Sequence, residues 1–446
     1  MNEINLKITG LGTNGEGVGR HEGLTIFIEG ALPNEEVAAE IIQSKKNYAV
    51  ATLKKILRAS DDRVKPFCPI YEECGGCQLQ HLSYDAQLKW KRRQVVDAVK
   101  HIGKLDGIKI FDTLGMENSL RYRNKMQFPV AKNKSNLIIG CYARGSHKIV
   151  DTNACLIQRE GMDEVLIAVK KILQRFNISA YDEDTHRGIL RHVMSRIGLG
   201  GEIMIVLVTA TKNLPAEKNI VKAIRHELPQ VVSVQQNIQT YHNNVILGRE
   251  TKILYGKPTI KDKLGKLTFN ISARSFFQVN TAQAEVLYNV ALDFASLTGK
   301  EIVIDAYCGI GTITLFLAKS ARKVYGIEIV PTAIDDAKKN ARENKIHNAE
   351  FFAGDAVQII PRLYREGVHA DVVIVDPPRA GCDKKVLETF AAMNPSKIIY
   401  VSCNPATLAR DLAILFELGY TTKKIQPVDM FPYSSHVESV SLLVKD

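Results

Sequence analysis

Cys403 stands in Ser402-Cys403-Asn404-Pro405, directly after the apolar run 397–402. A loop at that place presents a thiol above the end of a strand. A thiolate is a strong nucleophile and well suited to conjugate addition. Pro405 suits the first position of a helix, and a helix start favours the thiolate over the thiol. The sequence therefore predicts a nucleophile at Cys403; the alternative is a small buried thiol, the usual role of a free cysteine.

Two carboxyl groups are expected near the same place. Asp376 ends the run 371–375 in Asp-Pro-Pro-Arg, where prolines without an N–H stop the strand ladder. His436 and Glu438 precede the run 439–444 and supply an acid–base pair. Carbon 5 of a uracil ring becomes nucleophilic only after a thiolate adds to carbon 6, and a base must then remove the carbon 5 proton. These residues therefore suit alkylation of a pyrimidine by a sulfonium donor.

A glycine-containing turn follows the run 301–306 and opens a helix. It reads Asp305-Ala306-Tyr307-Cys308-Gly309-Ile310-Gly311-Thr312, and the glycines let the backbone approach a ligand closely. Glu328 ends the next run, where an acid can accept hydrogen bonds from both ribose hydroxyls, and Asp355 ends the third. This pattern fits S-adenosylmethionine better than a dinucleotide. The alternative is a Rossmann-like sheet with incidental acids.

The chain has eight cysteines, and three of them crowd into one short segment. These are Cys68, Cys74 and Cys77, and Cys155 is the expected fourth partner. In a long chain whose start lacks a basic head and an apolar stretch, metal ligation or catalysis is expected rather than a disulfide framework. The three remaining cysteines outside the Cys403 motif are expected to be packing residues: Cys141, Cys308 and Cys382.

The 446 residues are enough for about three domains. Residues 1–59 contain the short runs 24–29, 36–42 and 48–56 between glycine-rich or Pro/Asn turns, as in a five-stranded oligonucleotide-binding barrel. Lys45 and Lys46 beside Tyr48 are typical of a single-strand binder, although a solvated hairpin would look the same.

Residues 60–265 read as an α+β domain, with predicted helices at 84–101 and 162–176 and strands at 137–141 and 201–209. From 266 to 446 strands and helices alternate, as in a doubly wound, mainly parallel α/β sheet. Ligands of such sheets bind at the carboxyl ends of the strands, where the residues described above fall.

The formal charge of +11 favours a polyanionic partner, and a cytoplasmic location is expected because no membrane-spanning run is present. Phe276 is expected either to stack on a displaced base or to pack in the core. Candidate phosphate contacts are Lys89, Lys91, Arg92, Arg93, Arg121, Arg123 and Lys125. Contacts with phosphates would make RNA binding steeply dependent on salt.

Four segments together resemble the uracil-C5 RNA methyltransferase family, and the resemblance covers nearly the whole chain. They are Phe276-Phe277-Gln278-Val279-Asn280, residues 305–312, Asp376-Pro377-Pro378-Arg379-Ala380-Gly381 and residues 402–411. The resemblance implies a Rossmann-like S-adenosylmethionine-dependent methyltransferase domain, with Cys403 as nucleophile and Glu438 as base. It also implies cofactor contacts for Gln278, Tyr307, Thr312, Glu328, Asp355 and Asp376. Many family members carry Asn at the Asp355 position.

The N-terminal barrel and the cysteine segment resemble the ribosomal RNA branch of the family, which has a TRAM domain and a [4Fe–4S] cluster. Cys68, Cys74, Cys77 and Cys155 match its four cluster ligands. Zinc is the competing metal, but a three-plus-one arrangement without a second CxxC pair favours iron–sulfur. Radical chemistry is disfavoured because C-x3-C-x2-C is absent.

The resulting prediction is methylation of carbon 5 of a single-stranded or loop uridine in 23S ribosomal RNA by a monomeric enzyme. The target base must leave its stack to meet Cys403. Two alternatives stay open: methylation of transfer RNA by the same chemistry, and a non-catalytic RNA-binding factor in ribosome assembly.

Overall fold

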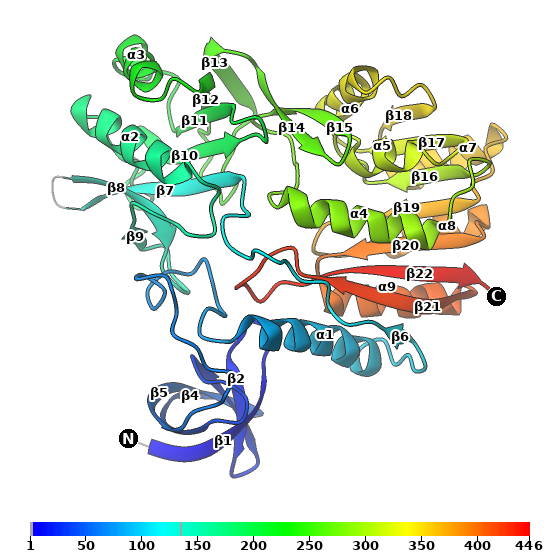
Figure 1. Cartoon of the computed structure of the whole chain (residues 1–446), viewed down its shortest axis with the longest axis horizontal. Coiled ribbons are helices and arrows are strands. Elements are labelled where there is room, and N and C mark those ends of the chain that lie inside the picture. Colours follow the sequence, from blue (N-terminus) through cyan, green and yellow to red (C-terminus); the bar gives the residue numbers. More distant parts are fainter. Residues whose placement is uncertain (1–2, 134–135) are drawn as a thin grey trace.

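The computed structural model describes residues 3–133 and 136–446. Its strands form a small barrel, a middle sheet, a two-stranded hairpin and a larger sheet that ends the chain. Figure 1 shows the barrel below, the middle sheet at the upper left and the larger sheet at the right. In the same view, the carboxyl ends of the parallel strands in the larger sheet face the region where the barrel, the middle sheet and the larger sheet approach one another.

The N-terminal body is a closed barrel with the strand order β1-β2-β3-β5-β4, which confirms the predicted five strands. Its strands are β1 (Glu3–Leu11), β2 (Gly17–His21), β3 (Leu24–Glu29), β4 (Glu36–Ser44) and β5 (Tyr48–Arg58). Along β1 the side chains alternate between exposed and buried, so Ile4, Leu6 and Ile8 fill the interior. The barrel is joined to the segment that follows it by an ion pair of Arg63 with the buried Glu35, at 2.5 Å.

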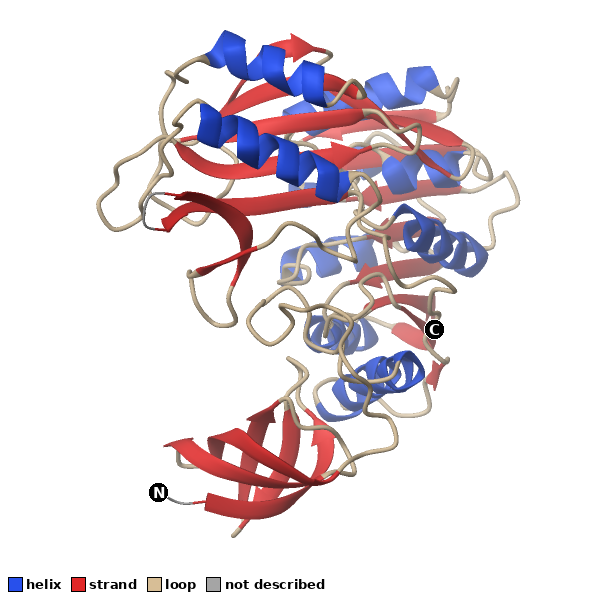
Figure 2. Ribbon diagram, turned by 60° about the vertical axis from the view of Figure 1, so that its left-hand side comes forward, coloured by secondary structure: helices blue, strands red, loops and turns tan. Residues whose placement is uncertain are grey.

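The middle body is a seven-stranded sheet covered by two helices, as expected for an α+β domain (Figure 2). Its strands are β7 (Lys125–Asn133), β8 (Asn136–Tyr142), β9 (Ile149–Asp151), β10 (Leu190–Ile197), β11 (Ile203–Thr209), β12 (Val231–Ile238) and β13 (Glu250–Gly256). The helices α2 (Met162–Arg175) and α3 (Glu217–Glu227) each place an apolar face on this sheet. The hairpin β14 (Thr259–Leu264) and β15 (Leu267–Ser272) then leads to the larger sheet.

The larger sheet has the order β18-β17-β16-β19-β20-β22-β21-β6. Its strands are β16 (Ile302–Ala306), β17 (Lys323–Glu328), β18 (Ala349–Ala353), β19 (Val372–Val375), β20 (Lys397–Ser402), β21 (Tyr420–Val428), β22 (Glu438–Lys445) and β6 (Lys109–Ile110). The strands β16 to β20 are parallel, and β22 is antiparallel to β20. The strand order reverses between β16 and β19, the place where such sheets bind ligands.

Helices cover both faces of this sheet, because successive buried residues of each strand point to opposite sides. Val303 packs with one helix layer and Ile304 with the other. The first layer contains α4 (Thr281–Ala295), α5 (Thr312–Ala318) and α6 (Pro331–Glu343). The second contains α1 (Tyr84–His101), α7 (Ala356–Arg365), α8 (Lys384–Met393) and α9 (Pro405–Glu417).

Two elements from the predicted middle segment belong spatially to the larger sheet. The helix α1 packs on α9, and β6 pairs in parallel with β21. The reason is burial: Val95 and Val99 of α1 are buried in the core of that sheet. None of the helices in the described part of the chain is long and apolar enough to cross a membrane.

Candidate active site

The predicted site residues gather at the carboxyl edge of the larger sheet. The turn after β16, Glu328 of β17, Asp355 after β18, Asp376 after β19 and Cys403 after β20 occupy successive strand ends. Parallel pairing places these ends side by side. Glu438 is the first residue of β22, which runs antiparallel to β20. Because Ser439 of β22 pairs with Ser402 at the end of β20, Glu438 lies at the same edge of the sheet.

The turn after β16 has the unusual backbone that the sequence indicated. Tyr307, Gly309 and Gly311 have φ values of +74°, +55° and +84°. A Cβ on Gly311 would lie 3.2 Å from the Phe351 ring, so a larger residue is disfavoured by both backbone and space. Thr312 begins α5, and its hydroxyl lies 3.4 Å from that of the buried Tyr288.

Glu328 is fixed beside this turn by two backbone donors. The N–H groups of Gly309 and Val330 donate to its two carboxylate oxygens, at 3.3 and 2.9 Å. The next side chain, Ile329, is 67% exposed. An exposed apolar side chain can pack on the flat face of a nucleoside base, and the anchored carboxylate beside it can accept hydrogen bonds from the ribose hydroxyl groups. Sequence reasoning did not select Ile329, although an apolar pair after the acid was visible.

Asp305 is the most deeply buried acid of the edge. Thr314 donates to its Oδ2 at 2.5 Å, while its Oδ1 has no partner. Burial raises the pKa of Asp305 to about 7, against the effect of the Thr314 hydrogen bond. An orphaned buried carboxylate oxygen fits a site that receives a positively charged or hydrogen-bond-donating ligand.

The other predicted ligand-binding residues lie around this edge in different ways. Asp355 is exposed and caps α7 by accepting the N–H of Val357 at 2.9 Å, which leaves part of its carboxylate available. Gln278 is buried between β15 and α4, and its carbonyl accepts a hydrogen bond from Asn124. Phe276 is 70% exposed, so the core-packing alternative for it is wrong.

Cys403 lies half-buried at the end of β20, directly before α9. The side chain of Asn404 accepts the N–H of Ala406 and so caps α9, with Pro405 at the first helical position as expected. A cavity of about 620 Å³ opens beside the thiol. Its walls include the barrel loop at 11–14, the face of α1 near His101, and Arg379 and His436. The barrel therefore reaches the edge that carries Cys403, which the sequence did not indicate.

Two buried carboxyl groups adjoin Cys403. Burial and the charge of Asp376 raise the pKa of Glu438 to about 8, and burial raises that of Asp376 to about 6. Burial, Glu438 and Asp376 also raise the pKa of Cys403 to about 11, against the opposing charge of Arg379. Desolvation and two acids thus oppose the expected preference of the helix start for the thiolate, which stays a prediction.

Arg379 is the cation of this cluster, and sequence reasoning gave it no role. It opposes the raised pKa values of both Cys403 and Glu438, and its Nη2 lies 3.4 Å from Nε2 of His436. Burial and Arg379 lower the pKa of His436, which favours its neutral form. The Asp-Pro-Pro-Arg motif contained this signal, since an arginine directly after a site acid is a natural counter-charge.

The predicted metal-ligating cysteines line one cavity of about 650 Å³. Cys68, Cys74 and Cys77 come from the loop before α1, and Cys155 comes from the segment between β9 and α2. No three His, Cys, Asp or Glu side chains within residues 3–133 and 136–446 are arranged to hold a single metal ion.

Cys141 also lines this cavity, so the interpretation of Cys141 as a packing residue alone is incomplete. A hydrogen bond from Cys141 lowers the pKa of Cys74 to about 6.

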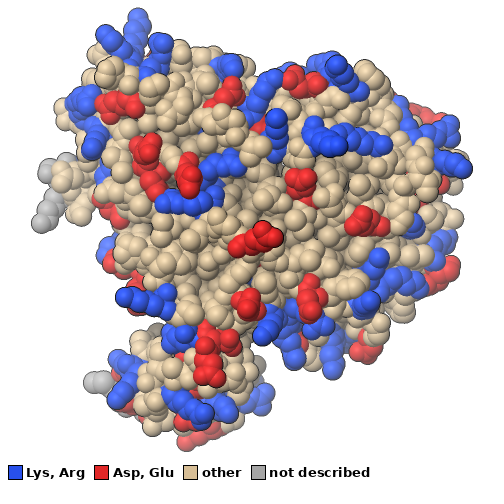
Figure 3. All heavy atoms as spheres, viewed as in Figure 1, with Lys and Arg blue, Asp and Glu red and all other residues tan. Residues whose placement is uncertain are grey.

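Several predicted phosphate contacts have structural partners instead. Lys91 is fully buried in an ion pair with Asp429, and Arg121 pairs with Asp163 at 2.7 Å. Burial and the nearby Arg196 lower the pKa of Lys125 to about 7. Exposed Lys and Arg remain over α1 and the barrel, interspersed with acids (Figure 3).

Comparisons with known proteins agree with this geometry. Residues 83–446 match the family described as tRNA (Uracil-5-)-methyltransferase, and residues 2–54 match the TRAM domain. An uncharacterized RNA methyltransferase of Clostridium tetani is 52% identical over 98% of this chain and 95% of its own length. One from Halalkalibacterium halodurans is 50% identical over 99% and 96%.

A solved structure extends the likeness to three dimensions. The Pyrococcus abyssi tRNA (uracil-54, C5)-methyltransferase in complex with S-adenosyl-L-homocysteine has a TM-score of 0.78 and 29% sequence identity. The likeness covers 99% of this chain and all of that one. The chain therefore belongs to the RNA uracil-5-methyltransferase family, and it is an S-adenosylmethionine-dependent enzyme with an N-terminal TRAM domain.

Proposed function

We propose that this enzyme methylates a uridine through a transient covalent bond between Cys403 and carbon 6 of the base. The observation that carries the proposal is the cluster of Cys403, Glu438 and Asp376 beside a cavity of about 620 Å³. A nucleobase needs a recess of this kind beside the nucleophile once it has left its stack.

The thiolate of Cys403 donates an electron pair to carbon 6, and the pair of the 5,6 double bond moves toward the carbonyl at carbon 4. When bound, S-adenosylmethionine would supply the methyl group. The bond between carbon 5 and the methyl carbon would form as the bond between the methyl carbon and the sulfonium breaks, with S-adenosylhomocysteine as the leaving group. Glu438 then removes the proton from carbon 5, the 5,6 double bond re-forms, and the bond between sulfur and carbon 6 breaks. One proton leaves in the complete reaction. Glu438 is the base and Cys403 the nucleophile.

Six residues are proposed to hold the cofactor or to border it: Gln278, Tyr307, Thr312, Glu328, Asp355 and Asp376. The anchored carboxylate of Glu328 supports a ribose contact, and the glycine turn supports close approach of the amino-acid part. The orphaned oxygen of Asp305 supports a positively charged ligand nearby. Ile329 adds an apolar surface beside Glu328.

The four cysteines Cys68, Cys74, Cys77 and Cys155 are proposed to hold a [4Fe–4S] cluster. Their thiols line a shared cavity of about 650 Å³, which suits a cluster of several atoms. A single tetrahedral zinc would need all four sulfurs about 2.3 Å from one point. A cluster held by four thiolates has no open iron for substrate, so we assign it a structural or RNA-positioning role.

The proposed substrate is 23S ribosomal RNA, and transfer RNA is the second candidate. The first rests on the barrel together with the cysteine segment. The second is favoured by the Pyrococcus abyssi neighbour, which acts on uracil-54 of transfer RNA. We propose that the enzyme acts as a cytoplasmic monomer.

Unmodified transcripts distinguish the two substrates. The enzyme is incubated with 23S ribosomal RNA fragments or with transfer RNA and a labelled methyl donor, and the products are mapped by mass spectrometry. We expect 5-methyluridine at a loop position of the ribosomal RNA. Label in transfer RNA alone would select the second candidate, and label in neither, with folded cofactor-binding protein, would contradict both.

A further inference from the structure

The segment 429–437 connects β21 to β22 and leads directly into Glu438. Val428 pairs with Glu438, so this connector closes a loop whose two ends lie side by side. It carries His436, which lines the cavity beside Cys403. Both Asp429 and Ser434 are buried. The connector therefore adjoins both Glu438 and the cavity beside Cys403.

One face of α1 carries a row of polar side chains that all bond to this connector. Tyr84, Gln87, Lys91 and Gln94 follow one another at intervals of three or four residues, so they share one side of the helix. Tyr84 donates to Asp429 at 2.9 Å, and Gln94 donates to the carbonyl of Ser435 at 3.2 Å.

Gln87 makes the central contact between the connector and the cysteine segment. Its side-chain oxygen accepts the N–H of Tyr433 at 3.0 Å, and its Nε2 donates to the carbonyls of Leu79 and Leu82. The N–H groups of Gln78 and Leu79 in turn donate to the carbonyl of Tyr433. The connector is thus held between α1 and the loop that carries the cysteines.

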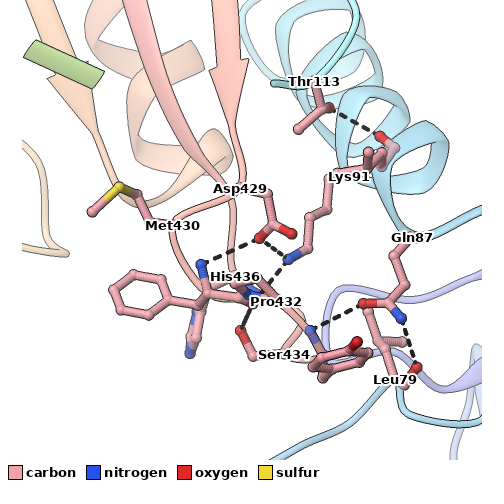
Figure 4. Close-up of polar contacts among 12 residues, drawn as sticks. Leu79, Gln87, Lys91, Thr113, Asp429, Met430, Pro432, Ser434 and His436 are labelled. Carbon is pink, nitrogen blue, oxygen red and sulfur yellow. Dashed lines mark hydrogen bonds and ion pairs between the residues drawn. The ribbon is translucent and has the colours of Figure 1, made fainter. Parts of the chain in front are cut away.

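Lys91 is the buried cation of this row. Its Nζ lies 2.5 Å from Oδ1 of Asp429 and donates to the carbonyl of Phe431 at 3.0 Å, while its side chain has no exposed surface (Figure 4). Burial lowers the pKa of Lys91, and Asp429 opposes that effect. A buried ion pair adds little net stability over apolar residues of the same size. Its strict geometry is therefore better explained by placement of the connector than by stability.

We propose that Lys91, supported by Tyr84, Gln87 and Gln94, is a positioning residue that places Glu438 for proton removal from carbon 5. This inference rests on the proposed covalent route. It predicts a specific defect: methyl transfer still occurs when the connector shifts, but release of the methylated base from Cys403 slows.

The test is Lys91→Met in the full-length protein, compared with Lys100→Met. Lys100 is exposed on the same helix and has no partner in the connector among the hydrogen bonds and ion pairs of the described chain. For Lys91→Met we expect unchanged S-adenosylmethionine affinity and a kcat lowered about 10-fold to 100-fold, since small misplacements of a catalytic group cost that much. RNA covalently bound to the protein should accumulate on a denaturing gel. Lys100→Met should behave as the unmodified enzyme.

Lys91→Met leaves Asp429 buried without its cation and can therefore prevent folding. A second variant keeps the inference testable in that case. Gln94→Met removes one hydrogen bond to the connector and no charge. It should also accumulate the methylated adduct, to a smaller extent. If Lys91→Met and Gln94→Met lose activity only in proportion to folded protein, with no accumulated adduct, the positioning role is wrong.

Glu438→Gln separates this inference from the proposed function. If Glu438→Gln accumulates the adduct and the α1 variants do not, the covalent route stands and the positioning role fails. If Glu438→Gln itself forms no adduct with RNA and donor, the covalent route with Glu438 as base fails first.

Discussion

At the scale of single residues, the site keeps side chains protonated that catalysis needs in their ionised forms. Cys403, Glu438 and Asp376 all have raised pKa values because they are desolvated, and nearby acids raise the pKa values of Cys403 and Glu438 further. Cys403 and Glu438 were recognisable from local motifs and resemblance. Their mutual effect was not, because it depends on three strand ends that are far apart in sequence.

The rate of methylation should therefore rise with pH. Glu438 acts as a base only after it loses its proton, and its pKa is raised to about 8. The thiol of Cys403, with its pKa raised to about 11, loses its proton in the same direction. Single-turnover rates with sub-saturating donor should increase at least roughly tenfold per unit below about pH 8. A rate that is flat from neutral to alkaline pH would contradict this assignment.

The positive charge of the methyl donor should change the protonation of the buried acids at the site. A sulfonium favours the ionised forms of Asp305, Asp376 and Glu438, whereas the neutral product S-adenosylhomocysteine does not. Binding of S-adenosylmethionine should release protons and strengthen as pH rises through the pKa values of about 6 to 8. Calorimetry in buffers of different ionisation enthalpy measures this release. Equal proton release by both compounds would show that the acids do not face the sulfonium.

At the scale of elements, the strands and helices that hydrophobic periodicity predicted lie within two residues of the observed bounds. The predicted helix at 84–101 matches α1, and the barrel closes as expected. Periodicity could not show that α1 and β6 join the larger sheet, because it indicates which face of a segment is buried and not which element covers that face. The boundaries at 59 and 265 stay predictions, as does the division into 1–59, 60–265 and 266–446.

The turn between β4 and β5 offers a direct test of RNA binding by the barrel. Lys45 and Lys46 are exposed beside Tyr48, and the N–H of Lys45 donates to the carbonyl of Tyr48 at 2.8 Å. Replacing both lysines by Ala should weaken RNA binding and reduce the slope of log affinity against log salt by up to about 1.4, or about 0.7 per lost single-strand phosphate contact. Cofactor affinity should not change. An unchanged salt slope would assign the RNA contacts to other surfaces.

At the scale of the whole molecule, the chain brings the barrel, the helix α1 and the cysteine segment to one edge of the larger sheet. The barrel loop at 11–14 and α1 line the cavity beside Cys403, while the cysteine segment contacts the connector before Glu438. Net charge correctly suggested a polyanion, but Lys91 proved to be a buried structural cation, and Arg121 is held in an ion pair with Asp163. The sequence shows the sign of a side chain's charge but not the group that pairs with it, which is why these positions were predicted to contact phosphates.

The cysteine cavity predicts a cluster with a measurable composition. Protein purified without oxygen should contain iron and acid-labile sulfide in equal amounts and absorb in the visible range. Replacing Cys155 by Ala should remove the iron and loosen the loop before α1, because Cys155 is the one proposed ligand of the four that lies outside that loop. Stoichiometric zinc without iron would contradict the iron–sulfur assignment.

The central claim is a bond between Cys403 and the target base, and one measurement tests it most directly. Glu438→Gln protein is mixed with substrate RNA and S-adenosylmethionine, digested, and analysed by mass spectrometry for a nucleotide-bearing peptide. The account predicts a methylated uridine attached to the peptide that contains Cys403, and no such peptide when Cys403→Ala is added. A Cys403→Ala enzyme that still methylates uridine at carbon 5 would contradict it.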